Sequence, residues 1–181
     1  RALSGQEFDQ AIRAYQRMQE ECRGIRLCAS FGLLTEEQFV RLRECGVTMY
    51  HANIETSRRN FPNICTTHTF DDKLACIRGA KKAGLHVCSG GIIGMGETWE
   101  DRLDMALTLA EHGVDSIPLN ALIPIRGTPF GELPVLTEDE ILRTVVMFRF
   151  INPAAYVRLA AGRTLMRENG KEAFFAGANA T

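Results

Sequence analysis

Apolar residues follow two alternating patterns along this chain. Segments in which every third or fourth residue is apolar alternate with short apolar, often β-branched runs. The first pattern is typical of helices that bury one face, and the second of strands. Helices are predicted near 8–18, 36–44, 71–83, 99–112 and 138–151, and strands at 25–29, 47–51, 85–89, 114–119 and 155–159. A short helix near Leu165 precedes the run 173–177, and a last strand is expected to end close to the final residues.

Local signals indicate where the predicted helices begin and end. Thr35 and Thr137 each precede a helical segment whose first turn is acidic, as N-cap threonines do. Gly46, Gly84 and Gly113 follow three helical segments and each leads into a strand. The elements therefore repeat as a helix, a glycine and a strand.

This alternation indicates βαβ units, a parallel sheet and the α/β class. A doubly wound sheet and a barrel are both compatible with it, and about six strand–helix units favour a barrel. No low-complexity linker or charge block interrupts the chain, so a single domain over residues 1–181 is predicted.

The composition excludes several classes of protein. With 181 residues, 45% hydrophobic content and a net charge of −1, the chain can bury a core but has no basic stripe for nucleic acid or an anionic membrane. No apolar run is long enough for a membrane helix, and no signal peptide is evident, so a cytoplasmic location is expected. The chain opens on Arg1 rather than Met, and we expect it to be a fragment.

Chemically active side chains lie at the carboxyl ends of the predicted strands, where parallel α/β proteins bind ligands. These residues are Cys28, His51, Asn53, Glu55, Cys88, Asn120, Arg158 and Asn179. Their coincidence predicts one shared site that includes a metal. Six cysteines without close pairing also favour thiols or metal ligands over a disulfide framework.

Each residue also has a structural interpretation. A single strand cysteine is more often a small buried hydrophobe than a ligand, and Cys22, Cys45 and Cys76 are interpreted as structural thiols in predicted helices. Cys65 lies in a loop, where it could be either a structural thiol or a metal ligand. Asn53 and Glu55 share a face if their strand extends that far, and otherwise belong to a turn.

Arg158 lies in an apolar strand and should have an anionic partner, either a carboxylate or a metal–sulfur cluster.

The run from Cys88 to Glu97 places a thiol before four glycines and a carboxylate. Glycines allow a close backbone approach, so this loop is expected to hold a ligand. It matches neither the Gly-Lys-Ser/Thr phosphate loop nor the dinucleotide-binding glycine motif, and the four histidines lack zinc-hydrolase spacing.

Six collinear stretches, which together span nearly the whole chain, form a recognisable set: 50–57 (YHANIETS), 63–69 (NICTTHT), 88–98 (CSGGIIGMGET), 118–120 (PLN), 156–163 (YVRLAAGR) and 175–179 (FAGAN). They resemble the biotin synthase family of radical S-adenosylmethionine enzymes.

The resemblance implies a (β/α)8 TIM-type barrel of the radical SAM kind, here a partial barrel, that inserts sulfur into dethiobiotin. It implies S-adenosylmethionine, a [4Fe-4S] cluster and an auxiliary [2Fe-2S] or other iron–sulfur cluster as sulfur donor. By motif, Cys28, Cys88 and Arg158 would ligate the auxiliary cluster. The implied cofactor contacts are Asn53, Glu55, Lys73, Gly90, Gly91, Ile92 and Ile123, and the implied substrate contacts are Asn53 and Asn120. Dethiobiotin, a flavodoxin or ferredoxin and a second copy of the chain are the implied partners.

Three departures from the family pattern bear on this interpretation. The Cys-x-x-x-Cys-x-x-Cys motif of the radical cluster is absent, and is expected upstream of Arg1, so the fragment alone is expected to be inactive. Glu55 and Lys73 replace the Asp and Arg of many members. Cys65 replaces an aliphatic residue and is a candidate further ligand.

The sequence leaves three alternative functions open. A hydrogenase-maturation or methylornithine-forming radical enzyme would share the barrel without needing Cys28, Cys88 and Arg158 together. A cluster-free lyase or aldolase would need a strand lysine or a phosphate loop, which are not evident. A non-catalytic binding domain with exposed strand edges is the third alternative.

Overall fold

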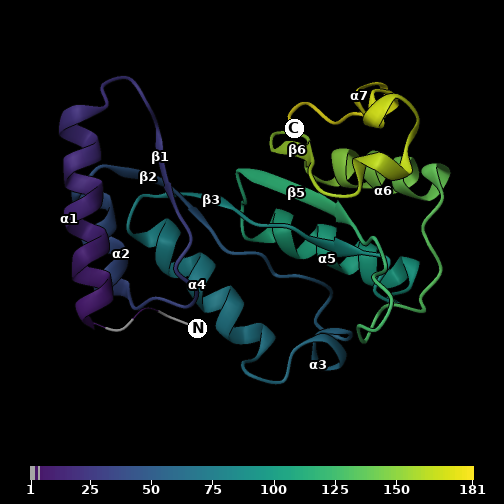
Figure 1. The fold of residues 1–181 in the computed structure, drawn as a ribbon, viewed down its shortest axis with the longest axis horizontal. Coiled ribbons are helices and arrows are strands. Elements are labelled where there is room, and N and C mark those ends of the chain that lie inside the picture. Colours follow the sequence, from purple (N-terminus) through teal and green to yellow (C-terminus); the bar gives the residue numbers. More distant parts are fainter. Residues whose placement is uncertain (1–2, 4) are drawn as a thin grey trace. The chain divides into compact units, whose positions relative to one another are not determined.

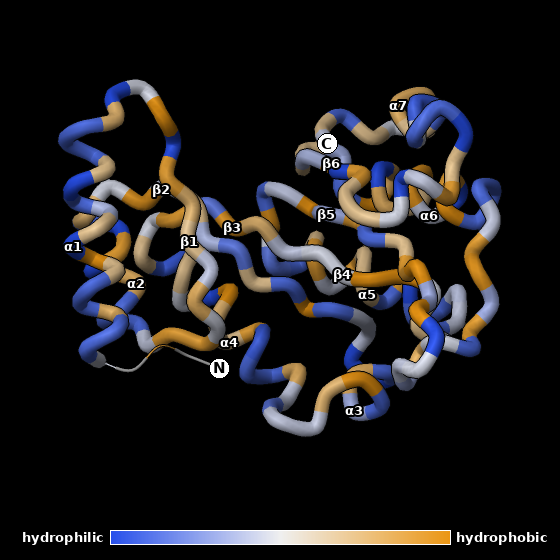
Figure 2. Tube along the Cα trace, viewed as in Figure 1, coloured by the Kyte–Doolittle hydropathy of each residue, from blue (hydrophilic) through white to orange (hydrophobic). Residues whose placement is uncertain are grey.

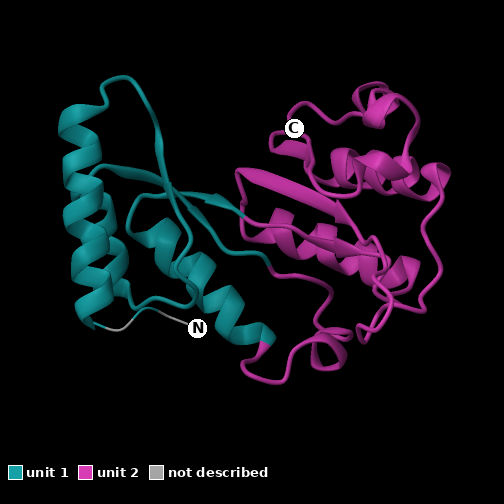
Figure 3. Cartoon of the chain, viewed as in Figure 1, with its two compact units in different colours: residues 1–53, 70–88 teal, residues 54–69, 89–181 magenta. Residues whose placement is uncertain are grey.

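The computed structural model describes residue 3 and residues 5–181, so Arg1 lies outside the described residues. It divides into two compact units (Figures 1 and 3): residues 1–53 with 70–88, and residues 54–69 with 89–181. Each unit is a parallel α/β layer, as the sequence predicted. The expectation of one domain over 1–181 stays a prediction.

The first unit contains three parallel strands in the order β1-β2-β3. Its elements are α1 (Gly5–Glu21), β1 (Leu27–Ala29), α2 (Glu36–Glu44), β2 (Val47–His51), α4 (Phe70–Lys82) and β3 (His86–Cys88). Phe39, Leu42, Val47 and Tyr50 have no solvent exposure, so their side chains form the core between α2 and the sheet. The rings of Phe39 and Tyr50 pack edge to face with centroids 4.8 Å apart.

The second unit also contains three parallel strands, with β5 between β4 and β6. Its elements are α3 (Phe61–Ile64), β4 (Gly91–Ile93), α5 (Trp99–Glu111), β5 (Ser116–Ala121), α6 (Glu138–Ile151), β6 (Tyr156–Leu159), the 3-10 turns η1 (Arg163–Leu165) and η2 (Arg167–Gly170), and α7 (Glu172–Phe175). Leu109, Ile117, Phe148 and Val157 are fully or almost fully buried, which places the core between the sheet and α5 and α6.

The predicted helix ends are confirmed. Thr35 and Thr137 accept hydrogen bonds from the backbone of the first turn and form complete capping boxes with Gln38 and Glu140. Gly46, Gly84 and Gly113 all have positive φ, the left-handed conformation that glycine adopts at least cost. In Figure 2, α1 is mostly hydrophilic, which fits a helix that buries only one stripe.

The structure differs from the sequence predictions in several segments. Strand β4 was not predicted because it lies within a glycine-rich run, which is not typical of strands. The short helix α3 was not predicted because four residues are too few to show a helical period. The run 173–177 contains α7, and only Ala180 forms a bridge, with Arg158. Two cysteines interpreted as helical lie just outside helices, since α1 and α2 end at Glu21 and Glu44.

Across the described residues, no helix is both long and apolar enough to cross a membrane.

Candidate active site

One face of the first unit's sheet carries both candidate cysteine ligands. Cys28 pairs with Met49, Met49 pairs with His86, and His51 pairs with Cys88. Paired residues in a parallel sheet project to the same side, and so do residues two apart on one strand. All five side chains therefore share one face. The opposite face, with Tyr50 and other buried residues, packs in the core.

The two cysteines of this face differ in environment. Cys88 is buried, and its Sγ lies 3.3 Å from Nδ1 of His51. The N–H of Ala52 donates to the carbonyl oxygen of Cys88, which joins the ends of the two strands. Cys28 is exposed, and its carbonyl oxygen accepts a hydrogen bond from the hydroxyl of Tyr15. The sheet thus fixes two thiols on one side.

Two other cysteines in this unit match their structural interpretation. Cys45 and Cys76 are buried, and burial raises the pKa of both thiols. Their Sγ–H groups donate to the carbonyl oxygens of Leu42 and Gly32. Both behave as small buried groups with a weak donor.

The predicted cofactor contacts of the first unit, Asn53 and Lys73, are both half-buried. Asn53 follows β2, and Lys73 lies in the first turn of α4. Their predicted roles stay predictions.

In the second unit, three predicted site residues share one face of the sheet. Ile92 pairs with Asn120, and Pro118, two residues earlier on β5, pairs with Arg158. Ile92, Asn120 and Arg158 are half-buried, whereas the neighbouring residues that point to the other side are buried. The side-chain amide of Asn120 donates to the carbonyl oxygen of Gly91 and accepts from the N–H of Ala161, which fixes its orientation.

Arg158 carries a buried donor without a protein acceptor. Its Nη2 donates to the carbonyl oxygen of Thr181, but its Nε is buried and has no hydrogen-bond partner among the described residues. A buried donor without an acceptor costs free energy. This guanidinium therefore fits a site where an electron-rich ligand completes its contacts.

Glu55 adopts an unusual backbone conformation. Its φ is 69°, in the left-handed region that non-glycine residues rarely occupy. Its N–H donates to the carbonyl oxygen of Gly90, and its own carbonyl oxygen accepts from the N–H of Ile92. Strand β2 ends at His51, so the condition for Asn53 and Glu55 to share a strand face is not met. Strain of this kind often accompanies ligand sites.

Gly90 and Gly91 allow neighbouring backbone to approach closely. A Cβ at Gly90 would lie 2.0 Å from the carbonyl oxygen of Pro118, and one at Gly91 would lie 2.4 Å from that of Glu55. Packing within the protein therefore explains why glycine is required at these two positions. The sequence had instead suggested close approach to a ligand.

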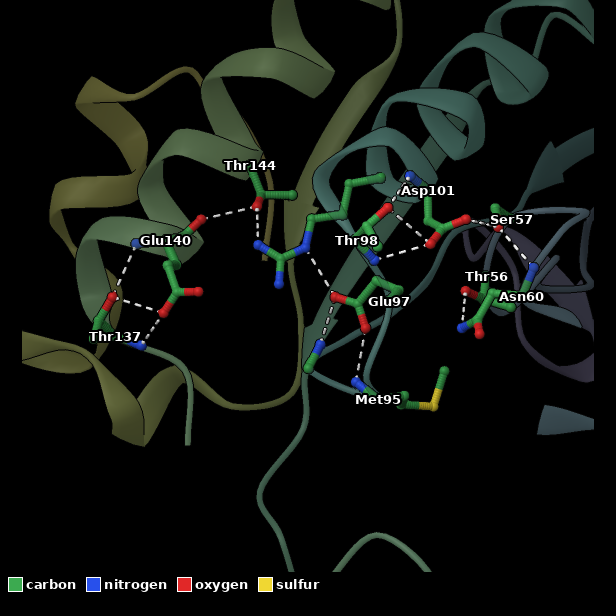
Figure 4. A network of polar contacts seen from close by, with 12 residues as sticks. Thr56, Ser57, Asn60, Met95, Glu97, Thr98, Asp101, Thr137, Glu140 and Thr144 are labelled. Carbon is green, nitrogen blue, oxygen red and sulfur yellow. Dashed lines mark hydrogen bonds and ion pairs between the residues drawn. The ribbon is translucent and has the colours of Figure 1, made fainter. Parts of the chain in front are cut away.

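The glycine-rich loop ends in a buried carboxylate that the sequence analysis had noted without a role. Glu97 accepts hydrogen bonds of 2.8 Å from the N–H groups of both Gly94 and Met95 (Figure 4). Its side chain is 1% exposed and pairs with Arg102 at 2.8 Å. The sequence holds a signal that could have identified this pair. It is a carboxylate just after two turn glycines, with an arginine five residues later.

A second acidic residue, Asp101, anchors the segment that follows Glu55. Its carboxylate accepts from the hydroxyl of Ser57, the guanidinium of Arg59 and the backbone and hydroxyl of Thr98. Burial opposes ionisation, but these hydrogen bonds outweigh it and hold the pKa of Asp101 well below its usual range.

The remaining candidates lie at the edges of the second unit. Ile123 is 48% exposed in the loop after β5. Cys65 follows α3, and its Sγ lies 3.4 Å from both Nδ1 of His68 and Oγ1 of Thr67. Within the described part of the chain, no three or more His, Cys, Asp or Glu side chains are arranged to hold a metal ion.

Two family models match successive segments of the chain. Residues 3–109 match the model described as the radical SAM superfamily, and residues 118–181 match the Biotin and Thiamin Synthesis associated domain. The first match covers more than half of the chain, so the chain belongs to the radical SAM superfamily.

Curated relatives confirm the resemblance to biotin synthases. The chain is 65% identical over 181 residues to a biotin synthase from Alkaliphilus metalliredigens (strain QYMF) and 62% identical over 181 residues to one from Clostridium beijerinckii. Both matches cover 100% of this chain and 57% of the relative, so the chain spans little more than half the length of these proteins.

Solved structures confirm the fold. A methylornithine synthase superimposes with a TM-score of 0.82 at 20% identity, over 97% of this chain and 52% of that protein. The hydrogenase maturase HydG superimposes with a TM-score of 0.78 at 18% identity, over 97% of this chain and 42% of that protein. At this identity the likeness concerns architecture alone: a partial barrel of the radical SAM kind.

Proposed function

We propose that this chain is part of a biotin synthase, which inserts sulfur into dethiobiotin in an S-adenosylmethionine-dependent reaction. The observation that carries the proposal is the 65% identity to a biotin synthase over all 181 residues. The match to the Biotin and Thiamin Synthesis associated domain supports it independently of the radical SAM match. The rival radical enzymes resemble the chain at about 20% identity or less among the structures compared.

By the family resemblance, Cys28, Cys88 and Arg158 would hold an auxiliary iron–sulfur cluster. Cys28 and Cys88 share one sheet face and would provide thiolates. Arg158 has a buried Nε without a protein acceptor and would provide a guanidinium nitrogen. Cys65 is a candidate further ligand. When bound, S-adenosylmethionine and the two clusters supply the radical and the sulfur.

Other side chains would bind and orient the small molecules. Asn53 and Glu55 would hold the sugar of S-adenosylmethionine and orient dethiobiotin, and Lys73 would lie near the methionyl end. Ile92 would line the adenine site, and Gly90, Gly91 and Ile123 would be further cofactor contacts. Asn120, already held by two backbone hydrogen bonds, would present its amide to the ureido ring of dethiobiotin without reorganising.

We further propose a [4Fe-4S] cluster held by residues outside this chain, a [2Fe-2S] or other auxiliary cluster, and a flavodoxin or ferredoxin as electron donor. A cytoplasmic homodimer is the proposed form.

The test uses the complete polypeptide that carries this sequence, purified anaerobically. Iron, sulfide and visible absorbance are quantified for the parent and for Cys88→Ala, and biotin formation from dethiobiotin is assayed. The proposal expects two clusters in the parent, selective loss of one in Cys88→Ala, and loss of biotin formation in that variant.

Cys22→Ala is the matched control because this thiol is exposed and outside the candidate site. It should keep both clusters and full activity. One cluster in the parent, unaffected by Cys88→Ala, would point to another radical enzyme, and an iron-free parent would point to a cluster-free barrel.

A further inference from the structure

The loop that follows β4 depends on a single buried carboxylate for its shape. Gly94 and Gly96 have positive φ, so the chain turns sharply twice within three residues. Glu97 closes this turn by accepting from the N–H groups of Gly94 and Met95. The conformation of the loop therefore depends on the acceptor oxygens of a carboxylate side chain that is 1% exposed.

Arg102, on α5, compensates that buried charge. Its Nε donates to Oε1 of Glu97 at 2.8 Å, and the arginine side chain is itself only 5% exposed. Its guanidinium carbon also lies 4.6 Å from the ring centroid of Trp99, which restricts it further. A buried ion pair is costly to break because the remaining charge is left without compensation. Arg102 thus holds the Glu97 carboxylate in place beside the loop.

Thr144, on α6, holds Arg102 from the other side. Nη1 of Arg102 donates to Oγ1 of Thr144 at 3.3 Å, and the threonine hydroxyl donates to the carbonyl oxygen of Glu140 at 2.8 Å. Because the hydroxyl hydrogen is used by Glu140, an oxygen lone pair faces the arginine. Thr144 is completely buried, so water cannot replace this contact. Figure 4 shows the chain of contacts from Thr137 and Glu140 through Thr144 to Glu97.

These contacts connect two segments that family models match separately. Arg102 lies in the segment matched by the radical SAM model, whereas Thr144 lies in the segment matched by the Biotin and Thiamin Synthesis associated domain. The loop that they brace begins directly after Ile93, one residue beyond the proposed adenine contact Ile92.

We infer that Arg102 and Thr144 are positioning residues through which the C-terminal segment sets the affinity of the glycine-rich loop for the adenosyl part of S-adenosylmethionine. The inference rests on the proposed function, because it takes this loop as part of the cofactor site. Neither residue touches the cofactor in this account. Both act through Glu97 and the two backbone N–H groups that it fixes.

The test compares Thr144→Val with the parent in the complete, anaerobically reconstituted enzyme. Valine keeps the shape of threonine but removes the oxygen that accepts from Arg102. Loss of a hydrogen bond to a charged group, partly relieved by relaxation, predicts a rise of about threefold to tenfold in the Kd for S-adenosylmethionine. The KM for this cofactor should rise likewise, while the KM for dethiobiotin, the iron content and kcat at saturating cofactor stay at parent values.

Thr108→Val is the matched control. Thr108 is a half-buried threonine on α5, and its side chain makes no hydrogen bond within the described chain. It should bind the cofactor as the parent does. Arg102→Lys provides a second variant that keeps the charge but loses the second nitrogen that reaches Thr144, and it should raise the Kd by about tenfold.

Two results would overturn the inference. A Thr144→Val enzyme with parental Kd and KM for S-adenosylmethionine would show that the loop does not depend on α6. A variant that only loses iron or kcat, with unchanged cofactor affinity, would show a purely structural role. If instead the parent itself does not bind S-adenosylmethionine, the proposed function fails and the inference fails with it.

Discussion

The Nδ1 atom of His51 lies 3.3 Å from the Sγ atom of Cys88, and the two residues pair directly across β2 and β3. This contact gives the proposed cluster ligand a neighbour able to donate an N–H to its sulfur when Nδ1 carries the proton. The sequence placed both residues at strand ends, but only the strand register brings the two side chains together.

We predict that His51→Leu lowers the reduction potential of the auxiliary cluster. A hydrogen bond to a ligating sulfur favours the reduced, more negative state, and leucine cannot donate one. Spectroelectrochemical titration of the complete enzyme measures the potential. His86→Leu is the control, because His86 lies on the same face but pairs with Met49. Equal potentials in the parent and His51→Leu would contradict the prediction.

Gly90→Ala should severely destabilise the protein. The new Cβ would lie 2.0 Å from the carbonyl oxygen of Pro118, and backbone cannot move aside as a flexible side chain can. We expect a loss of about 3 kcal/mol or more in the free energy of unfolding, measured by urea denaturation. Gly5→Ala has open space around its Cβ and serves as the control. Similar midpoints for the two variants would refute the packing argument.

Tyr50→Phe tests how the segment after β1 is held. The Tyr50 hydroxyl donates to the carbonyl oxygen of Gly32 at 2.6 Å and accepts from the N–H of Phe31 at 3.0 Å. Removing it leaves two backbone groups without their partner, at a cost of about 1–2 kcal/mol in unfolding free energy. Tyr156→Phe, at an exposed tyrosine, should change stability by less than about 0.5 kcal/mol. Equal effects would exclude a special role for the buried hydroxyl.

Asp101→Asn should destabilise the protein near neutral pH and make its stability less sensitive to acid. The pKa of Asp101 is depressed in the folded protein, so the folded state favours the ionised form. The stabilisation is complete above the unfolded pKa of about 4 and is lost as the pH falls below it. We expect a loss of about 2 kcal/mol at pH 7 that shrinks toward pH 3.

Unfolding of the parent and Asp101→Asn between pH 3 and pH 7 measures this difference. Asp139→Asn is the control, since Asp139 is exposed and pairs with Arg143 one helical turn away. A difference between the parent and Asp101→Asn that does not change with pH would contradict the assignment of the ionised form.

Much of the candidate site could be proposed from sequence because strand ends in parallel α/β proteins lie on one side. That rule identified Cys28, Cys88, Asn120 and Arg158 as site candidates. The strand register places Cys28 and Cys88 on one face in the first unit, and Asn120 and Arg158 on one face in the second. The rule could not identify Arg102, because a helical arginine has no sequence period that marks it as buried. Its partner Thr144 lies 42 positions away.

The sequence by itself determined the local structure of this protein. Threonine caps, helix-ending glycines and apolar periodicity act between residues a few positions apart, so Thr35, Thr137 and Gly46 could be interpreted without a fold. The tertiary structure alone decided the left-handed backbone at Glu55, the need for glycine at Gly90 and the contact of Arg102 with Thr144. These depend on groups that folding brings from distant segments, and no local pattern records them.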